Sequence, residues 1–495
     1  MNLFNSISEK RDLIGKIFFI ISMIILLYMF ISPLNKTYIH VDEYFTLSII
    51  QFPLNEMWSI ILNDVHPPLY YFILIIFVKI FSSFMNTLLI SKIVSIIPYL
   101  LLIIISMAKI KEEYNWFTAG LFTFSIGIMS GFLIQFLTAR MYGWSLFFLV
   151  MSFIYMKDVL IKSDLKSWLL FTIFSIFSIY THNILLISVG FIYLTIIVNI
   201  LLNINNKKEK ITELKKWFVS TLICILSYVP WLFVILGQIN AKHGNGNTSF
   251  NLQNFFDCLL SFINSTNNII LQVLGLIFLI LIIIIILNQY FDNKNKDNYY
   301  ILSGIIIFLL TLIVSAIIIP LLFAPIYAKY LLPVCGIMWL SISILLNNVK
   351  NKKLFSILIL LIILMGCLNS ISLLNESNNL YKVGHEENIV LEQINNKNNV
   401  YLYPNEYNYI YYHNHLNETQ GYNIKKFKNI NDNNITFEKN ITKILLDNNN
   451  KNIYTMKKIT NESDLDYGKN ISATKVGGRG YNWIIKLELK DDLKT

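Results

Sequence analysis

Two neighbouring carboxylic acids, Asp42 and Glu43, follow the first long apolar run of the chain, and their flanks are apolar or aromatic. A carboxylate held near a low-dielectric surface has a raised pKa and can act as a general base. Its chemistry here would be removal of a proton from an acceptor hydroxyl group. The alternative is an acid pair in an ordinary solvated loop.

A second polar stretch, 63–71, reads Asn-Asp-Val-His-Pro-Pro-Leu-Tyr-Tyr. Asn63 or Asp64 can cap a helix, and the two prolines after His66 suit its first turn. We therefore expect a helix to begin here. A histidine in that turn can donate a hydrogen bond to an anion held by the helix N-terminus, whereas the alternative is a histidine that only decorates the cap.

Three further places join a cation to tyrosines at the ends of apolar segments. Arg140 precedes Tyr142, Lys329 precedes Tyr330, and His182 closes a Tyr-Thr-His stretch. A guanidinium binds phosphate in a bidentate way. Each place also has an ordinary explanation: an arginine that snorkels to the interface, an aromatic belt, and a structural histidine.

Transfer of a sugar from a lipid-linked phosphate requires an acidic side chain and cations that bind the phosphate. The acid takes the proton of the acceptor, and the cations stabilise the charge that grows on the departing phosphate. The lipid tail would stay in the bilayer. We therefore expect the elements that position these residues to be membrane helices.

The composition agrees with a membrane protein, since only 14% of the 495 residues are charged against about 25% in soluble proteins. The run 269–287 is long enough to cross a bilayer and carries no charge. The net charge of +10 comes from lysine clusters between apolar runs, where lysines set topology. We therefore expect no nucleic-acid partner. The four cysteines show no disulfide or metal-binding spacing.

The lysine clusters predict a cytoplasmic N-terminus and place Asp42 outside the cell. The first apolar run lacks a signal-peptide cleavage site, so we expect a retained helix. Two apolar segments, 69–84 and 87–108, lie between Asp42, which is outside, and Lys109, which is inside. An odd number of crossings must connect the two sides, so one segment does not span the membrane. We expect it to be 69–84, which is short and begins at two prolines. About eleven crossings are expected, at 14–34, 87–108, 116–137, 141–156, 167–182, 184–202, 217–236, 269–288, 300–319, 330–347 and 354–374.

Residues 376–495 are rich in Asn, Lys and Tyr and contain no spanning run. Alternating apolar residues predict strands at 399–403 and 482–489, and short helices are expected at 386–394 and 438–446. The predicted fold is an all-α polytopic membrane domain (residues 1–375, with the Asp-Glu motif in an outer loop at 35–68) and a small extracytoplasmic α/β domain (376–495).

The Asp-Glu pair, the His-Pro-Pro-Leu-Tyr-Tyr stretch and the later Ala-Arg-Met-Tyr stretch resemble motifs of the C-type glycosyltransferases. The match is best to the family 39-like group, which includes protein O-mannosyltransferases and aminoarabinose transferases acting on lipid A. It covers roughly residues 10–350. The resemblance implies a polyprenyl-phosphate sugar donor, a membrane lipid environment, an extracytoplasmic acceptor and an inverting transfer.

The resemblance also implies residue roles. It makes Asp42 the base with Glu43 beside it, and it puts His66 and Arg140 near the donor phosphate. Lys329-Tyr330 resembles a late Arg-Tyr pair of the family, with lysine in place of arginine. Further substrate contacts are expected from Tyr70, Tyr142 and His182. No second acidic motif for a divalent metal stands near Arg140, so no metal cofactor is predicted.

Two other functions fit a polytopic chain. A transporter or flippase for lipid-linked sugars usually shows internal repeats and charges at mid-membrane depth, and neither is visible here. A non-catalytic scaffold for envelope assembly would use the C-terminal domain to bind a partner. Sugar, acceptor class and prenyl length cannot be read from the sequence.

Overall fold

The structure is a computed structural model of the full chain. It describes all residues except 1–9, 36–40, 65, 130, 243–251, 264–267, 293–295, 322–325, 405–411, 413–415, 417, 425–434, 460–461, 480–481 and 491–495.

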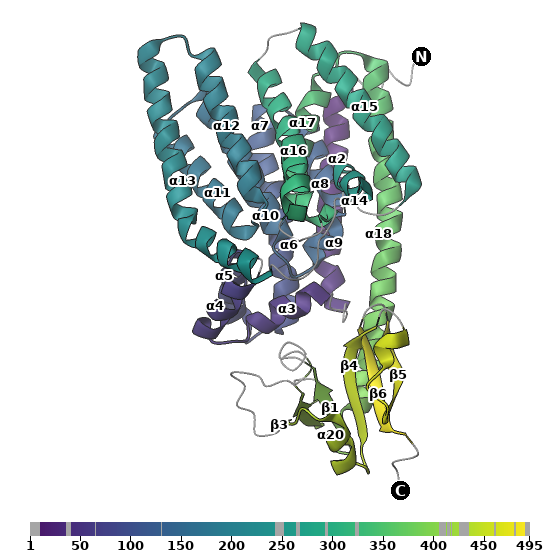
Figure 1. The fold of residues 1–495 in the computed structure, drawn as a ribbon. Coiled ribbons are helices and arrows are strands. Elements are labelled where there is room, and N and C mark those ends of the chain that lie inside the picture. The colour runs from purple at the N-terminus through teal and green to yellow at the C-terminus, as the bar shows by residue number, and fades with distance from the viewer. Residues whose placement is uncertain are drawn as a thin grey trace. The chain divides into compact units, whose positions relative to one another are not determined.

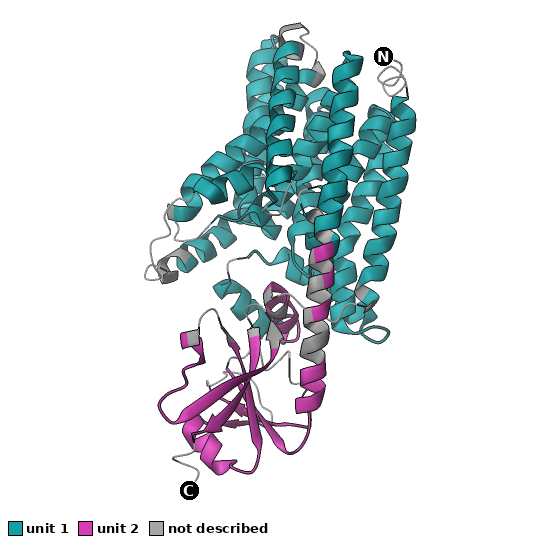
Figure 2. Cartoon of the chain, turned by 90° about the vertical axis from the view of Figure 1, so that its right-hand side faces the viewer, with its two compact units in different colours: residues 1–34, 54–374 teal, residues 35–53, 375–495 magenta. Residues whose placement is uncertain are grey.

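The chain divides into two compact units, which differ in colour in Figure 2. Unit 1 contains residues 1–34 and 54–374, and unit 2 contains residues 35–53 and 375–495. The segment that carries the Asp-Glu motif therefore groups with the C-terminal part of the chain. The two units are described separately below.

Unit 1 is a helical bundle (Figure 1). In the described part of the chain, nine helices are long and apolar enough to cross a membrane. They are α2 (Arg11–Ile31), α6 (Thr87–Ile105), α10 (Tyr142–Ile161), α12 (Leu185–Asn203), α13 (Lys207–Lys242), α15 (Ile269–Asp292), α16 (Lys296–Leu321), α17 (Ala328–Asn347) and α18 (Lys352–Ile394). The chain is a multi-pass membrane protein.

Shorter elements connect these helices. They are the 3-10 turn η1 (Ser32–Asn35), α4 (Leu54–Asn63), α5 (Leu69–Phe81), the π-helical turn η2 (Ser106–Ile110), α7 (Lys111–Glu113), α8 (Trp116–Ile128), α9 (Phe132–Leu137), α11 (Leu165–Thr181) and α14 (Leu252–Leu259). The two remaining predicted crossings correspond to α8–α9 and α11. Helix α5 has 13 residues, about 20 Å, and is shorter than a bilayer core of about 30 Å.

The prediction of one continuous helix at 116–137 is wrong. Helix α8 ends at Ile128, and α9 begins after Gly131, whose φ of 66° lies in the left-handed region. A residue in that conformation cannot continue a right-handed helix. The break leaves a short helix, α9, that ends shortly before Arg140.

Helices α2 and α8 pack with their backbones in close contact at a pair of glycines. A Cβ atom at Gly15 would lie 2.2 Å from the carbonyl oxygen of Trp116, and one at Gly120 would lie 1.9 Å from that of Gly15. Only glycine fits at such a distance, which is how membrane helices commonly approach each other. The contact fixes α8 against the first helix.

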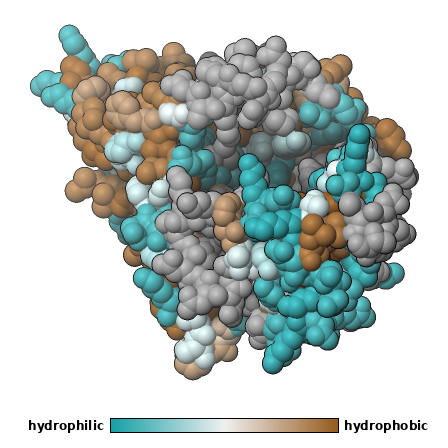
Figure 3. Space-filling view, turned by 60° about the horizontal axis from the view of Figure 1, so that its bottom comes forward, coloured by the Kyte–Doolittle hydropathy of each residue, from teal (hydrophilic) through white to brown (hydrophobic). Residues whose placement is uncertain are grey.

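Burial separates the centre of the bundle from its periphery. Most residues of α10 and α17 are buried, whereas α13 and α15 expose most of their apolar side chains. Exposed apolar side chains on long helices suit contact with lipid. In the space-filling view, hydrophobic residues dominate one part of the visible face and hydrophilic residues another (Figure 3).

A network of ion pairs joins α10 to the segment before α8. The carboxylate of Asp158 pairs with Lys109 and, at 3.2 Å, with Lys162. The neighbouring Lys157 lies 2.6 Å from Glu113 and stacks over the ring of Tyr114. These pairs hold the π-helical turn, where the backbone hydrogen bonds change register.

Unit 2 contains a six-stranded sheet in the order β3-β2-β1-β4-β6-β5. Its elements are α3 (Val41–Ile49), the end of α18, β1 (Asn399–Tyr403), β2 (Gln420–Asn423), β3 (Ile435–Phe437), α20 (Ile441–Asp447), β4 (Asn452–Lys458), the 3-10 turn η3 (Glu462–Leu465), β5 (Ile471–Arg479) and β6 (Asn482–Leu489). The first four strands of that order pair in parallel, and β6 pairs antiparallel with β4 and β5.

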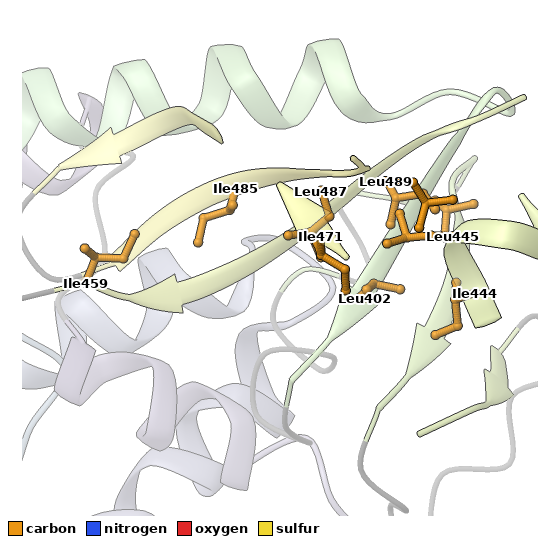
Figure 4. Packing of buried hydrophobic residues seen from close by; sticks show 10 residues of the cluster. Leu402, Ile444, Leu445, Ile459, Ile471, Ile485, Leu487 and Leu489 are labelled. Carbon is orange, nitrogen blue, oxygen red and sulfur yellow. The ribbon is translucent and has the colours of Figure 1, made fainter. Parts of the chain in front are cut away.

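Both faces of the sheet are covered. Tyr401 and Tyr403 of β1 pack with the end of α18. Val400 and Leu402 pack on the opposite face with α20, and Figure 4 labels Leu402, Ile444 and Leu445 of this cluster. Successive side chains of a strand point to opposite faces, so β1 is buried along its whole length. The strands predicted at 399–403 and 482–489 are confirmed.

The two short helices predicted in this region need correction. The one expected at 386–394 is wrong as a separate element, because α18 runs without interruption to Ile394. The one expected at 438–446 begins at Ile441 instead. Asn440 precedes it, and its side-chain oxygen accepts a hydrogen bond from the backbone N–H of Lys443. This cap sets the start of the helix.

Candidate functional site

His66 lies in the short connection between α4 and α5. Helix α5 begins after Pro68, and no side chain caps it. The predicted cap by Asn63 or Asp64 is therefore wrong. The Asp64 carboxylate instead accepts hydrogen bonds from the His66 ring, with Nδ1 at 3.1 Å, and from the hydroxyl of Tyr71, at 3.0 Å.

A side chain from another helix contacts the backbone of the connection between α4 and α5. The side-chain amide of Gln238, on α13, donates to the carbonyl oxygen of Leu62 at 3.1 Å and to that of Asp64. The last carbonyls of a helix, and those that directly follow it, have no intrahelical partner. Gln238 supplies one and ties α13 to the segment that carries His66.

Arg140 lies in the bend between α9 and α10. Its side chain is 5% exposed, and its Nη2 atom is 3.2 Å from Nε2 and 3.5 Å from Nδ1 of His66. The family resemblance predicts both residues beside the donor phosphate. The structure brings their side chains into contact within unit 1.

His182 follows the last residue of α11 and is also 5% exposed. Its ring centroid lies 6.1 Å from the ring of His66 and 5.7 Å from those of both Tyr142 and Tyr330. Burial and the nearby His66, Arg140 and Lys329 lower the pKa of His182 to about 3. The ring is therefore neutral at physiological pH.

The Nδ1 atom of His182 accepts from the backbone N–H of Ile184 at 3.3 Å, so the proton of the neutral ring belongs on Nε2. This buried Nε2 has no hydrogen-bond partner among the described residues. Its neighbour Asn183 accepts from Tyr228 at 2.9 Å and from Trp231 at 3.1 Å, both on α13. The loop that carries His182 is thus held in place while one ring donor faces the cluster of rings.

Lys329 and Tyr330 are in the first turn of α17. The Lys329 ammonium lies 5.9 Å from the ring centroids of Tyr327 and Tyr330, within the range of a cation–π interaction. Through Tyr330 the lysine is joined to His182. We call His66, Arg140, His182 and Lys329 the basic cluster.

Two other candidate residues have clear positions. Tyr142 begins α10 and is buried with its ring against His182. The Tyr70 hydroxyl lies 3.1 Å from the hydroxyl of Ser95 on α6. That contact gives Tyr70 a packing role between α5 and α6, whereas Tyr142 belongs with the basic cluster.

Asp42 and Glu43 lie in the first turn of α3, in unit 2. Glu43 is 1% exposed, whereas Asp42 is partly exposed. Shortly after α3, Phe52 packs against the core cluster that contains Tyr401 and Tyr403. The C-terminal unit therefore supports the segment that carries the acid pair.

Three residues that support the basic cluster were not predicted as site residues from the sequence: Asp64, Tyr71 and Gln238. The Asp-x-His spacing was visible, but Asp64 was interpreted as a helix cap. Nothing local in the sequence indicates Gln238, because it reaches the connection from a helix more than 170 positions away. Within the described residues no three His, Cys, Asp or Glu side chains form a metal-binding group.

The bundle, with polar clusters at its helix ends, has the fold of the C-type glycosyltransferases, as the sequence resemblance predicted. Two crystal structures of ArnT from Cupriavidus metallidurans match 95% of this chain and 97% of their own. The apo state superposes with a TM-score of 0.60 at 9% identity, and the state bound to undecaprenyl phosphate with 0.58 at 10% identity. No protein-family model and no curated protein matches the sequence.

Proposed function

We propose that this protein transfers a sugar from a polyprenyl-phosphate donor to an acceptor outside the cytoplasm. The observation that carries the proposal is the convergence of His66, Arg140, His182 and Lys329, from four separate segments, in one partly buried cluster of unit 1. The fold supports it, because one solved structure of the same fold holds undecaprenyl phosphate.

The basic cluster would bind the phosphate of the donor. Arg140 is the principal ligand in this proposal, since a guanidinium presents two parallel N–H groups to phosphate oxygens. Lys329 adds a point charge, and the Nε2–H of His182 adds a neutral donor. Arg140 and His182 are buried, which makes their interactions stronger than they would be in water.

In the transfer step, the acceptor oxygen attacks C1 of the donor sugar from the side opposite the phosphate. The bond from C1 to the phosphate oxygen breaks, and its electron pair leaves with polyprenyl phosphate. The hydroxyl proton passes to the carboxylate of Asp42, and the new glycosidic bond has inverted configuration. The basic cluster stabilises the growing phosphate charge.

The test uses cells that carry the wild-type chain, Asp42→Asn, or no chain. Mass spectrometry of the envelope glycans, glycolipids and glycoproteins should show one sugar that is missing without the chain and with Asp42→Asn. Loss of a general base lowers the rate by about 10²–10⁴-fold. Glu112→Gln, an exposed acid of α7, is the matched control and should keep the sugar. Identical profiles with and without the chain would contradict the transferase proposal.

We also propose a location in the cell membrane, with a cytoplasmic N-terminus and an extracytoplasmic unit 2. The lysine clusters support this orientation. In intact cells, a membrane-impermeant maleimide should label Asn450→Cys, an exposed position of unit 2, in a chain that also carries Cys367→Ser. Lys208→Cys, exposed at the start of α13, should stay unlabelled until the cells are opened. The reverse pattern would overturn the orientation.

A further inference from the structure

We propose that Asp64 is a positioning residue for Arg140 and that it acts through His66. The inference rests on the proposed function, because it gives Arg140 its task of binding the donor phosphate. Asp64 has not been assigned to the site by its sequence context, which suggested a helix cap.

The first observation is the shared carboxylate oxygen. Oδ2 of Asp64 accepts from both the His66 ring and the Tyr71 hydroxyl. The Asp64 and His66 side chains are only 12% and 14% exposed. Two donors on one oxygen of this partly buried carboxylate fix its direction. Asp64 can thus hold the imidazole of His66 in one orientation.

The second observation is the contact of Arg140 with the same ring. Nη2 of Arg140 lies 3.2 Å from Nε2 and 3.5 Å from Nδ1 of His66, so the guanidinium contacts the imidazole near both nitrogens. Nδ1 is also the atom that faces Asp64. The carboxylate and the guanidinium therefore contact one ring, and a rotation of that ring would break both contacts.

The third observation concerns the backbone. Gln238 donates to the carbonyl of Asp64 itself, so the position of the carboxylate is set from α13 and does not depend on α5 alone. A chain of contacts therefore leads from Gln238 through Asp64 and His66 to Arg140. Its effect is to hold the guanidinium in a single direction before the donor arrives, which reduces the ordering cost of binding.

The experiment measures binding of undecaprenyl phosphate to the purified full chain in lipid nanodiscs. The variants are Asp64→Ala, His66→Ala, the double variant and Arg140→Ala, with Glu112→Ala as the matched loss of an exposed carboxylate. Each single change at Asp64 or His66 should weaken binding about tenfold, as expected for a lost hydrogen bond to a charged group. The double variant should also be weakened about tenfold, because both changes interrupt the same chain of contacts.

A double variant weakened about a hundredfold would overturn the proposal, since Asp64 and His66 would then act independently. Unchanged binding in Asp64→Ala would overturn it as well. If Asp64→Ala does not fold, Asp64→Asn replaces it, because the amide keeps an acceptor but loses the charge. Asp64→Asn is then expected to weaken binding about threefold, and binding equal to wild type would contradict the role of the charge. Unchanged binding in Arg140→Ala would instead refute the phosphate assignment of the proposed function.

Discussion

The guanidinium Nη2 atom of Arg140 lies 3.2 Å from the Nε2 atom of His66, although 74 positions separate the two residues in the sequence. One residue stands in a bend before α10, and the other stands in the connection before α5. Burying a charged guanidinium has an energetic cost unless hydrogen bonds or an opposite charge offset it. In the proposed function, the phosphate of the donor supplies such a charge when it binds.

The first prediction concerns Arg140→Lys. Lysine keeps the positive charge but cannot bind a phosphate through two parallel N–H groups. We expect affinity for undecaprenyl phosphate to fall by about tenfold, with a thermal midpoint close to that of the wild type. Equal affinity in the two proteins would show that the charge of Arg140 matters and its shape does not.

The second prediction concerns Lys329, which stands where the resembled C-type glycosyltransferases have an arginine. Lys329→Arg keeps the charge over the rings of Tyr327 and Tyr330 and should retain donor affinity within about threefold. Lys329→Ala should lower the affinity about tenfold. The measurement is the same binding titration. If Lys329→Ala binds the donor as tightly as the wild type does, Lys329 is not part of the donor site.

The third prediction is a pH dependence of stability that comes from His182. Its pKa is lowered to about 3 in the folded protein, and the residue lies between α11 and α12. The unfolded chain takes up this proton near pH 6.5. Between about pH 6.5 and pH 3 the unfolded state binds one more proton, so stability falls as the pH falls through this window.

His182→Gln removes that proton uptake. Between pH 7 and pH 5 the variant should lose about 2 kcal/mol less unfolding free energy than the wild type. The measurement is thermal unfolding in detergent at both pH values. Parallel losses in the two proteins would show that other groups cause the acid sensitivity.

The fourth prediction concerns Phe52, which packs against the core of unit 2 shortly after the helix of the acid pair. Phe52→Ala should loosen the segment that carries Asp42. We expect turnover to fall about tenfold, because small misplacements of a catalytic group are costly, while binding of undecaprenyl phosphate is unchanged. Phe84→Ala, at a side chain 81% exposed, is the control and should leave both quantities unchanged. Loss of donor binding in Phe52→Ala would contradict the division of roles.

The fifth prediction is that the ion-pair network of α10 contributes to stability and not to donor binding. Asp158 is buried and pairs with Lys109 and Lys162. Asp158→Asn should lower the unfolding free energy by about 3 kcal/mol, because it leaves a poorly solvated lysine without its charge partner. Lys162→Met, which removes the exposed partner, should cost less than about 1 kcal/mol. Both variants should bind the donor normally, and altered binding would argue that the network shapes the site.

Much of the fold could be predicted because its signals are local. A run such as 269–287 exceeds the thickness of a bilayer, and the alternation in β1 follows from the pleat of a strand. The predicted helix boundaries were wrong where a single residue ends a helix within a long apolar segment, or where a helix continues past such a segment. Gly131 breaks an apolar segment that looked continuous, and α18 continues through polar residues into unit 2.

The candidate site was predicted only in part. Arg140, His66 and His182 could be selected because a polar or charged group at the end of an apolar segment is unusual. Their support by Asp64, Tyr71 and Gln238 could not, because the side chains that satisfy a buried group come from segments distant in the sequence. The grouping of residues 35–53 with the C-terminal unit was equally invisible in any local pattern.

The sequence by itself thus determined most of the membrane helices, two of the six sheet strands and the polar residues at helix ends, since hydrophobicity and chain periodicity act over a few turns. Only the tertiary structure decided that His66 contacts Arg140 and that Asp64 accepts a hydrogen bond from His66 instead of capping a helix. It also decided that His182 lies among the rings of His66, Tyr142 and Tyr330. Those outcomes depend on packing between distant segments. Each buried polar atom in such packing takes whichever partner the assembled helices bring within hydrogen-bond distance.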